Sequence, residues 1–330
     1  MSGSGEFDII SEVFAPLANN SAAAGLTDDV AVFGDGPVVA TKDLLIAGVH
    51  FLPSDPLDLV ARKLIRVNLS DLAAKGAKPL GYLLGCAWPS TVKRGDIEHF
   101  AAGLEEDQHT FKISLFGGDT TVHKLKSGPL TLSGSFFGAP PRGGVIARSG
   151  ASAGDDVYVS GTIGDAGLGL RVLTRAEKVA ASDRGPLAHR YHLPSPRLSL
   201  GGALVNLATA SIDVSDGLIA DAGHIALASS VAIEIKGPSV PLSPAVKRWA
   251  ATRPDADAAI RELATFGDDY ELLFTAPQSM RRSVSMAASA SRTEVARIGV
   301  VKRGDGVIIL DGEGVSHRLP GGGYDHFERS

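Results

Sequence analysis

The sequence predicts an α+β protein built from two domains. Its 330 residues are enough for two domains of ordinary size. Both halves mix short apolar runs, which are typical of strands, with stretches of helical periodicity, and the two do not alternate as regular βαβ units. Between the halves, residues 138–144 form a glycine- and proline-rich break that continues neither kind of element. We therefore predict domains at residues 1–140 and 141–330.

Five apolar runs in the first half indicate buried or half-buried strands. Two helical stretches accompany them. The first begins at Pro56, a residue favoured in the first turn of a helix, and extends to about residue 77. The second covers roughly residues 96–110, where apolar side chains recur at helical spacing. The expected strands are residues 30–33, 38–41, 80–88, 113–116 and 130–137.

The second half opens with an apolar strand at residues 156–160. A glycine-rich turn at residues 161–167 follows, and a helix is expected from there through residue 173. The remaining expected strands are residues 231–235, 271–275 and 307–310, and the remaining helices are residues 199–208 and 216–229.

Composition and charge restrict the classes of partner. Hydrophobic residues make up 44% of the chain, which is ample for a core. The net charge of −5, without any basic run, argues against nucleic acid and anionic membranes as partners. A single cysteine, Cys86, excludes an intramolecular disulfide and fits a reducing compartment. Neither a signal peptide nor a run of about 18 apolar residues is evident. These features predict a soluble cytoplasmic enzyme.

Six aspartates stand at expected turns or helix boundaries, each beside small residues. A fold that gathered them would hold more negative charge than it could keep unpaired. Hard, oxygen-seeking cations are the natural counterions, and Mg²⁺ usually arrives with substrate phosphates attached. The pattern therefore favours phosphoryl transfer. The six residues are Asp28, Asp43, Asp71, Asp119, Asp213 and Asp216.

Asp71 is the clearest case. On a helical wheel it falls, together with Asn68, on the apolar face of the helix that begins at Pro56. An ionised carboxylate on a buried stripe costs several kcal/mol unless it is paired or binds a cation. The alternative is an ordinary ion pair with Lys75, four residues further along the helix.

The other aspartates also have plain structural explanations. Asp119 in Gly117-Gly118-Asp119-Thr120 follows an expected strand, where glycines would let a phosphate approach, but turns favour glycine and aspartate anyway. In Asp213-Val214-Ser215-Asp216-Gly217, Ser215 or Asp216 could be a helix N-cap, although a helix start also binds anions. The Asp28–Asp29 pair could be a solvated turn. Asp43 stands at an expected strand end beside Lys42, which could pair with it.

Familiar nucleotide-binding signatures are absent. The sequence has no Gly-x-x-x-x-Gly-Lys motif of P-loop enzymes and no His-Arg-Asp or Asp-Phe-Gly of protein kinases. Zinc-ligand spacing and a nucleophile elbow are missing as well. An enzyme that uses ATP without these motifs needs another way to hold the triphosphate, and bridges from dispersed aspartates through Mg²⁺ supply one.

Taken together and in order, the motifs resemble one family. The sequence is similar to thiamine-monophosphate kinase of the AIR-synthase-like (PurM-like) superfamily over essentially its full length. The motifs that carry the resemblance are Gly5-Glu6-Phe7, Asp28-Asp29, Gly48-Val49-His50-Phe51, Asn68-Leu69-Ser70-Asp71, Gly117-Gly118-Asp119-Thr120, Arg148-Ser149-Gly150-Ala151, residues 161–165, residues 213–218, Asp268-Asp269-Tyr270-Glu271 and Gly323-Tyr324-Asp325-His326-Phe327.

The resemblance implies ATP-dependent phosphorylation of thiamine monophosphate to thiamine diphosphate by direct transfer. It assigns several Mg²⁺ ions to the six aspartates, with Thr41 assisting. It places ATP against Gly118, Asp119, Arg148 and Ser215, and thiamine monophosphate against His50, Asp268 and Tyr324. No side chain is expected to act as a general base, because the acceptor phosphate has a second pKa of about 6 and is already ionised at neutral pH.

The resemblance also implies an architecture. The N-terminal domain of the family binds ATP and metal, and its sheet joins that of a second copy into a barrel across a homodimer. The C-terminal PurM-like domain packs helices on a mixed sheet. We expect both features here.

Two departures from the family pattern are expected to matter. Lys42 stands where relatives commonly have a hydroxyl residue, and we predict that its ammonium replaces part of one cation's role. Asp268 stands where glutamate is usual, one methylene shorter. The alternative functions are another PurM-like enzyme that uses ATP, of the aminoimidazole ribonucleotide synthetase or hydrogenase maturation factor type, and a non-catalytic protein that binds metal or nucleotide.

Overall fold

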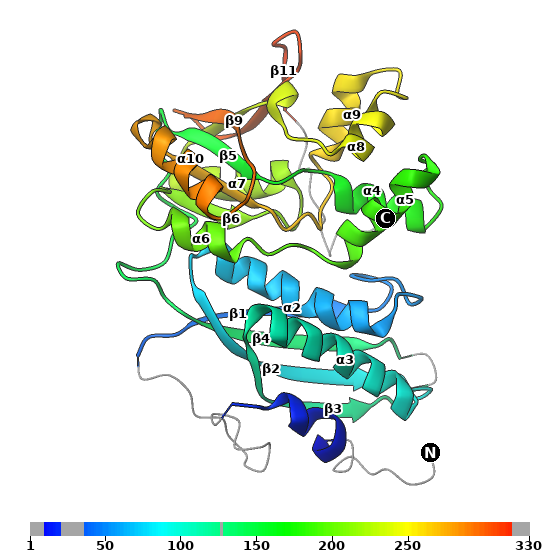
Figure 1. Cartoon of the computed structure of the whole chain (residues 1–330). Helices are drawn as coiled ribbons and strands as arrows, with labels where there is room; N and C mark the ends of the chain where they lie inside the picture. Colours follow the sequence, from blue (N-terminus) through cyan, green and yellow to red (C-terminus); the bar gives the residue numbers. More distant parts are fainter. Residues whose placement is uncertain (1–9, 21–35, 126–127, 319–330) are drawn as a thin grey trace. The chain divides into compact units, whose positions relative to one another are not determined.

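The computed structural model describes residues 10–20, 36–125 and 128–318 (Figure 1). The chain divides into two compact units. The first comprises Met1–Leu72 and Lys78–Pro140, and the second comprises Ala73–Ala77 and Pro141–Ser330. Strands and helices are mixed in both units, so the α+β prediction is confirmed. The strand expected at residues 30–33 lies outside the described residues, as do Asp28 and Tyr324.

A four-stranded sheet forms the centre of the first unit. Its strand order is β1-β4-β2-β3, in which β2 and β3 are parallel and the other pairs antiparallel. Two long helices accompany the sheet, and the short helical segments η1 (Ile10–Phe14) and η2 (Ala15–Leu17) precede it. The elements are β1 (Val39–Ile46), α2 (Leu57–Ala74), β2 (Lys78–Trp88), α3 (Arg94–Phe111), β3 (Ser114–Val122) and β4 (Thr131–Ala139).

Among the described residues, helices cover one face of this sheet. Along β4, buried and half-buried residues alternate, which is the pattern of a sheet with one face in the core. Residues of α2 approach β4 at Gly134, and on β2 the Trp88 ring packs edge-on against Phe100 of α3, with 5.4 Å between the ring centroids. Leu44 of β1 points to the other face and is 46% exposed. Among the described residues of the single chain the sheet is open, and the barrel expected across a dimer stays a prediction.

Two strands of this sheet are longer than the sequence predicts. β1 continues to Ile46 and β3 to Val122, so Asp43 and Asp119 lie within strands rather than at strand ends. The prediction was wrong because glycine and aspartate indicate turns locally, whereas neighbouring strands extend the pairing. Asp43 is opposite Gly134 of β4, and Asp119 is opposite Gly85 of β2.

The second unit contains a seven-stranded mixed sheet in the order β11-β10-β7-β9-β5-β8-β6. Only the β7–β10 pair is parallel. The strands are β5 (Asp156–Ser160), β6 (Ala210–Asp213), β7 (Ala232–Lys236), β8 (Leu272–Ala276), β9 (Val295–Lys302), β10 (Gly306–Leu310) and β11 (Ser316–His317).

Helices pack on both faces of the seven-stranded sheet. Val157 and Val159 of β5 belong to a core cluster that includes α7 (Leu218–Ser229). Tyr158, which points the opposite way, belongs to a second cluster with α6 (Leu198–Leu204) and α10 (Arg281–Ala290). A third cluster joins four further helices. They are α4 (Asp165–Leu173), α5 (Ala181–His192), α8 (Pro244–Ala250) and α9 (Ala256–Leu263). The single-turn helices η4 (Gly237–Ser239) and η5 (Gln278–Met280) complete the unit.

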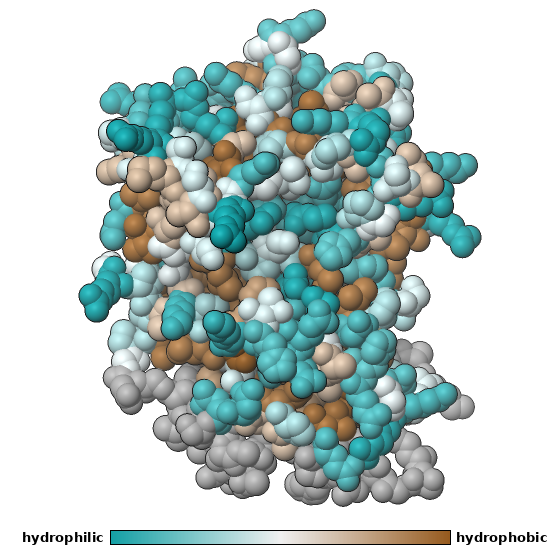
Figure 2. Space-filling model, viewed as in Figure 1, coloured by the Kyte–Doolittle hydropathy of each residue, from teal (hydrophilic) through white to brown (hydrophobic). Residues whose placement is uncertain are grey.

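Polar residues dominate the face of the molecule shown in Figure 2, and apolar residues form separate patches between them. Such a surface is expected where most of the protein meets water. Within the described part of the chain, no helix is both long enough and apolar enough to cross a membrane.

Candidate functional site

Three of the predicted metal ligands meet in the first unit. Thr41 and Asp43 are two residues apart in β1, so both side chains point to the face that α2 covers. The Thr41 hydroxyl donates a hydrogen bond of 2.5 Å to Asp71 Oδ2 on that helix. Burial, and after it the negative charge of Asp71, raises the pKa of Asp43 to about 7 against the opposing effect of Lys42. Among the described residues, neither of these two half-buried carboxylates forms an ion pair with a cationic side chain.

The chemistry of this group fits a hard cation. Thr41, Asp43 and Asp71 offer only oxygen atoms, which are the ligands of Mg²⁺. Asn68, one turn before Asp71, is fully buried; its Nδ2 donates to Leu64 O, while its Oδ1 has no hydrogen-bond partner among the described residues. A buried acceptor without a donor is costly. A bound cation would offset the negative charge of the two carboxylates and would offer Asn68 Oδ1 a partner.

Lys75, the alternative partner for Asp71, is used elsewhere. Its ammonium donates a hydrogen bond of 2.8 Å to the carbonyl of Ser211 in the second unit. The end of α2 explains the position of this lysine, because the helix stops at Ala74 and Gly76 turns the chain with φ of +65°.

Asp119 is not brought to this group within the single chain. Trp88 Nε1 donates to Thr120 Oγ1 on the helix-covered face, so Asp119, the preceding residue of β3, points to the open face. Moreover, β1 and β3 are opposite edges of the sheet, which places Asp119 about 14 Å from Asp43, three strand spacings away. Gly118 is required here because a Cβ would lie 2.0 Å from Leu84 O.

His50 is held with a defined tautomer in the loop after β1. The backbone N–H of Ile46 donates to His50 Nδ1 at 3.1 Å, so the proton of the neutral ring is on Nε2. Lys63 of α2, which is only 2% exposed, donates a hydrogen bond of 3.1 Å to the carbonyl of His50 and so holds the loop in place. Nε2 is therefore the donor atom of the neutral ring.

In the second unit, Asp213 ends β6 and Asp216 lies in the turn that leads into α7. Neither Ser215 nor Asp216 caps the helix, since Gly217 is the N-cap, with φ of +123°. Instead, Asp221 reaches back from inside α7 and accepts hydrogen bonds of 3.2 Å from the backbone N–H groups of Asp216 and Gly217. The capping alternative for Ser215 and Asp216 is therefore wrong, and both side chains remain candidates for ligand contacts.

Asp221 was not among the predicted residues. It is 1% exposed, and burial followed by repulsion from Asp216 raises its pKa to about 7. Donor atoms of Asp216, Asp221 and His224 all lie within 4.8 Å of one another. The spacing from Asp216 to Asp221 and then to His224 along one helix start was the available signal, although it identifies the residues only once the turn is known.

The predicted substrate residue Asp268 lies in an unusual backbone segment. Asp268 has φ of +69° and Tyr270 has φ of +50°, both in the left-handed region that favours glycine. Between them, Asp269 is completely buried. Strain of this kind costs about 1–3 kcal/mol per residue and concentrates at functional sites.

Arg148 lies on an exposed loop beside β6. The Ala147 carbonyl accepts from Ser211 N of that strand at 2.9 Å, and a Cβ at Gly150 would lie 2.5 Å from Thr209 O. Within the described part of the chain, the guanidinium of Arg148 has no ion-pair partner. It is therefore available to an anion.

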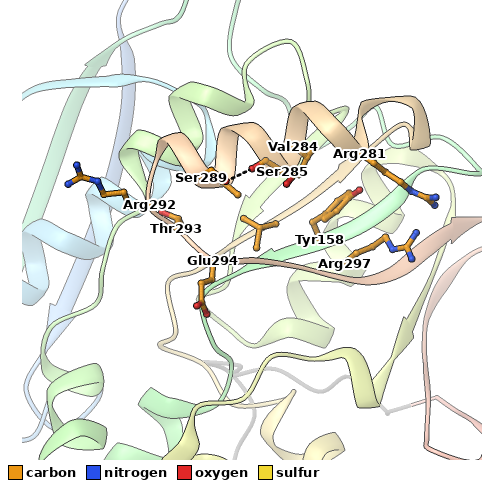
Figure 3. Close-up of a pocket in the computed structure, with 11 residues that line it drawn as sticks. Tyr158, Arg281, Val284, Ser285, Ser289, Arg292, Thr293, Glu294 and Arg297 are labelled. Carbon is orange, nitrogen blue, oxygen red and sulfur yellow. Dashed lines mark hydrogen bonds between the residues drawn. The ribbon is translucent and has the colours of Figure 1, made fainter.

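A separate cleft of about 430 Å³ in the second unit contains none of the predicted site residues. It lies between α10 and strands β5 and β9, and Figure 3 shows Tyr158, Arg281 and Arg297 at one end and Arg292 at the other. Arg281 makes a bidentate ion pair with Asp156, with distances of 2.6 and 2.9 Å, so its charge is already compensated.

Comparison with known proteins agrees with this arrangement. Residues 27–139 match the family model described as AIR synthase related protein, N-terminal domain. That span includes the sheet and the Thr41–Asp43–Asp71 group. Over that span the chain is therefore similar to the N-terminal domain of AIR synthase related proteins.

Close relatives narrow the class. Thiamine-monophosphate kinase of Caulobacter vibrioides is 44% identical over 306 residues, covering 92% of this chain and 85% of the relative. The crystal structure of thiamine-monophosphate kinase from Stenotrophomonas maltophilia superposes with a TM-score of 0.80 at 36% identity, covering 92% of this chain and 96% of that one. A structure described as AaThiL complexed with AMPPCP and TMP superposes with a TM-score of 0.76 at 29% identity, covering 98% of this chain and 97% of that one. The chain belongs to the thiamine-monophosphate kinase family.

Proposed function

We propose that this protein transfers the γ-phosphoryl group of ATP to thiamine monophosphate and forms thiamine diphosphate. The observation that carries the proposal is the 44% identity to a thiamine-monophosphate kinase over 92% of the chain. The half-buried Thr41–Asp43–Asp71 group supplies the physical support, because it offers only oxygen atoms and brings two carboxylates together.

Mg²⁺ fits this group by donor type and by charge. When bound, the metal would neutralise charge between ATP and the anionic acceptor and would align the two. Asp43 and Asp71 hold it in the first unit with help from Thr41, and Asp213 and Asp216 serve the same role in the second. Asp28 belongs to the same proposed set by its motif.

The other proposed roles follow from the chemistry of each side chain. Arg148 and Ser215 bind ATP phosphates, and Gly118 and Asp119 of β3 also contact ATP. His50 donates from Nε2 to the acceptor substrate, which Asp268 and Tyr324 also contact. No base is needed to remove a proton, because a phosphate monoester with a second pKa of about 6 is already largely ionised at neutral pH.

We also propose that the first unit forms a homodimer by closing its open sheet against that of a second copy. Two observations support this. Among the described strands, β1 and β3 are the outer strands of the sheet, and exposed edges favour pairing with another chain. Asp43 and Asp119 lie on these two opposite edges, so pairing between copies would place one residue of each kind at a shared seam.

A direct assay tests the proposed reaction. The protein, ATP, Mg²⁺ and thiamine monophosphate are incubated, and thiamine diphosphate and ADP are separated by chromatography. We expect equal amounts of both products, and a loss of about 100-fold or more in kcat/KM for Asp71→Asn, since a group that stabilises transferring charge is typically worth that much. Asp58→Asn on the same helix, whose partner is the exposed His99, is the matched control.

Two results would contradict the proposal. ATP turnover with a different acceptor and none with thiamine monophosphate would favour another enzyme of the superfamily. ATP binding without turnover on any phosphorylated acceptor would favour a non-catalytic role.

A further inference from the structure

Four ionisable side chains form a network next to the strained Asp268–Tyr270 segment: the buried Glu271 and Asp269 and the half-buried Arg190 and Arg197. Glu271 is completely buried and accepts hydrogen bonds from two arginines: Arg190 at 2.9 Å and Arg197 at 2.5 and 2.6 Å. The Ser160 hydroxyl, at the end of β5, donates to the same carboxylate at 2.6 Å and in turn accepts from Leu272 N.

Asp269 completes the network. Its carboxylate accepts hydrogen bonds from Gly164 N at 2.6 Å and Ala166 N at 3.3 Å, at the start of α4. Its backbone carbonyl accepts from Arg190 at 3.3 Å. Both arginines are thereby hydrogen-bonded to Glu271, and Arg190 contacts the residues on either side of Tyr270.

The backbone around this network leaves little room for change. Gly161 has φ of +56°, and a Cβ there would lie 2.1 Å from Glu271 Oε1. The left-handed residues Asp268 and Tyr270 flank Asp269, so the network anchors the middle of the segment whose backbone is strained on both sides. Without such anchors, the strained conformation would relax.

The same segment is hydrogen-bonded to the turn that carries the acidic residues of the second unit. Asp268 N donates to Ser215 O, Tyr270 N donates to Val214 O, and Val214 N donates to Glu271 O, each at 2.8 Å. The Asp213–Gly217 turn has its own anchor, because Asp221 binds its backbone N–H groups. Weakening the network should therefore let Asp268 move more than the Asp213–Gly217 turn.

A buried ion pair is weak evidence for stability, because the cost of removing charges from water offsets their attraction. Its better-supported use is to specify one conformation. We infer that Arg190 and Arg197, acting through Glu271 and Asp269, are positioning residues that hold Asp268 in place for the acceptor substrate. This inference rests on the proposed function, which makes Asp268 a contact for the phosphorylated acceptor.

The test compares Arg197→Lys with a matched control. Arg197→Lys keeps the positive charge but removes the bidentate fork, and loss of such a supporting contact typically costs about 10-fold or more. The control is Arg281→Lys, which removes a similar bidentate pair to buried Asp156 in the same unit, at the cleft shown in Figure 3. Ser160→Ala, which removes a single hydrogen bond to Glu271, is a milder variant should Arg197→Lys not fold.

We expect Arg197→Lys to raise the KM for thiamine monophosphate about 10-fold while the KM for ATP changes less than twofold. Arg281→Lys should leave both unchanged. Lower thermal stability of Arg197→Lys with both KM values unchanged would overturn the inference, because that is the result of a purely structural role. Equal effects of the two substitutions on KM would overturn it as well.

Backbone hydrogen exchange separates this inference from the proposed function. The amides of Asp268 and Tyr270 should exchange faster in Arg197→Lys than in the parent or in Arg281→Lys, whether or not thiamine monophosphate is the substrate. Unchanged exchange in that segment would overturn the inference even if the reaction is confirmed. Faster exchange in an enzyme that acts on another acceptor would keep the positioning role and reject the proposed substrate.

Discussion

Individual carboxyl groups in this protein differ in how their negative charge is compensated. Glu271 is paired with arginines, whereas Asp43 shares a half-buried place with Asp71 and has a pKa raised to about 7. Lys42, which precedes Asp43 in the sequence, lies on the other face of β1, where its ammonium donates to Ser133 Oγ at 2.5 Å. The predicted role of Lys42 as a partial replacement for a cation stays a prediction.

Asp269 gives a prediction about pH. Burial raises its pKa to about 8 from the ordinary value of 3.8. The folded protein thus keeps a proton that the unfolded chain releases above a pH of about 4, and this group's contribution to stability declines as pH rises from there to about 8. Asp269→Asn has no such proton. We expect the free energy of unfolding of the variant, relative to the parent, to rise with pH by up to about 1.4 kcal/mol per unit in this window. Urea titrations at several pH values measure it, and a pH-independent difference would contradict the shifted pKa.

Secondary-structure elements show where sequence reasoning succeeds and where it stops. Residues 156–160 were predicted as a strand and form β5, because a short apolar run bounded by polar residues and glycine is a local signal. β9 and the short helices α8 and α9 were not predicted, although Ser243 and Asp255 cap the two helices and are local signals of a helix start. The true ends of β1 and β3 were missed because the length of these strands is set by pairing with β4 and β2.

The residues of the candidate site also fall into those that the sequence predicts and those that it misses. The family motifs identified Thr41, Asp43 and Asp71, and the structure brings them together. Asp221 and the arginines around Glu271 act through contacts between segments distant in the chain or through a turn conformation. No local pattern of charge or periodicity reports such contacts, so sequence alone could not assign them a role.

The two glycines of β3 provide a test of strand packing. A Cβ at Gly118 would lie 2.0 Å from the Leu84 carbonyl oxygen, whereas a Cβ at Gly117 would meet only the flexible Leu83 side chain at 3.3 Å. We expect Gly118→Ala to lower the free energy of unfolding by about 1–3 kcal/mol, as overpacking does, and Gly117→Ala to change it by less. Chemical denaturation of both variants compares them. Equal stability of the two would mean that the β2–β3 pairing is wrong.

The whole molecule raises the question of assembly, since one copy leaves Asp119 far from Asp43 on the sheet. Leu44 lies on the open face and is 46% exposed, so a second copy closing on that face would bury it. We expect the parent protein to be dimeric at micromolar concentration and Leu44→Lys to shift it toward monomer, as measured by light scattering after size-exclusion chromatography. Leu227→Lys is the control, because Leu227 is 82% exposed on α7 of the other unit. A monomeric parent, or a Leu44→Lys variant that stays dimeric, would contradict the proposed assembly.

Metal binding at the acidic group of the first unit is the claim on which the rest depends. Crystals grown with Mn²⁺, which replaces Mg²⁺ and scatters anomalously, and with a non-hydrolysable ATP analogue would show it directly. We predict an anomalous peak within about 2.0–2.3 Å of carboxylate oxygens from both Asp43 and Asp71. A bound nucleotide with no peak at these two residues would contradict the account.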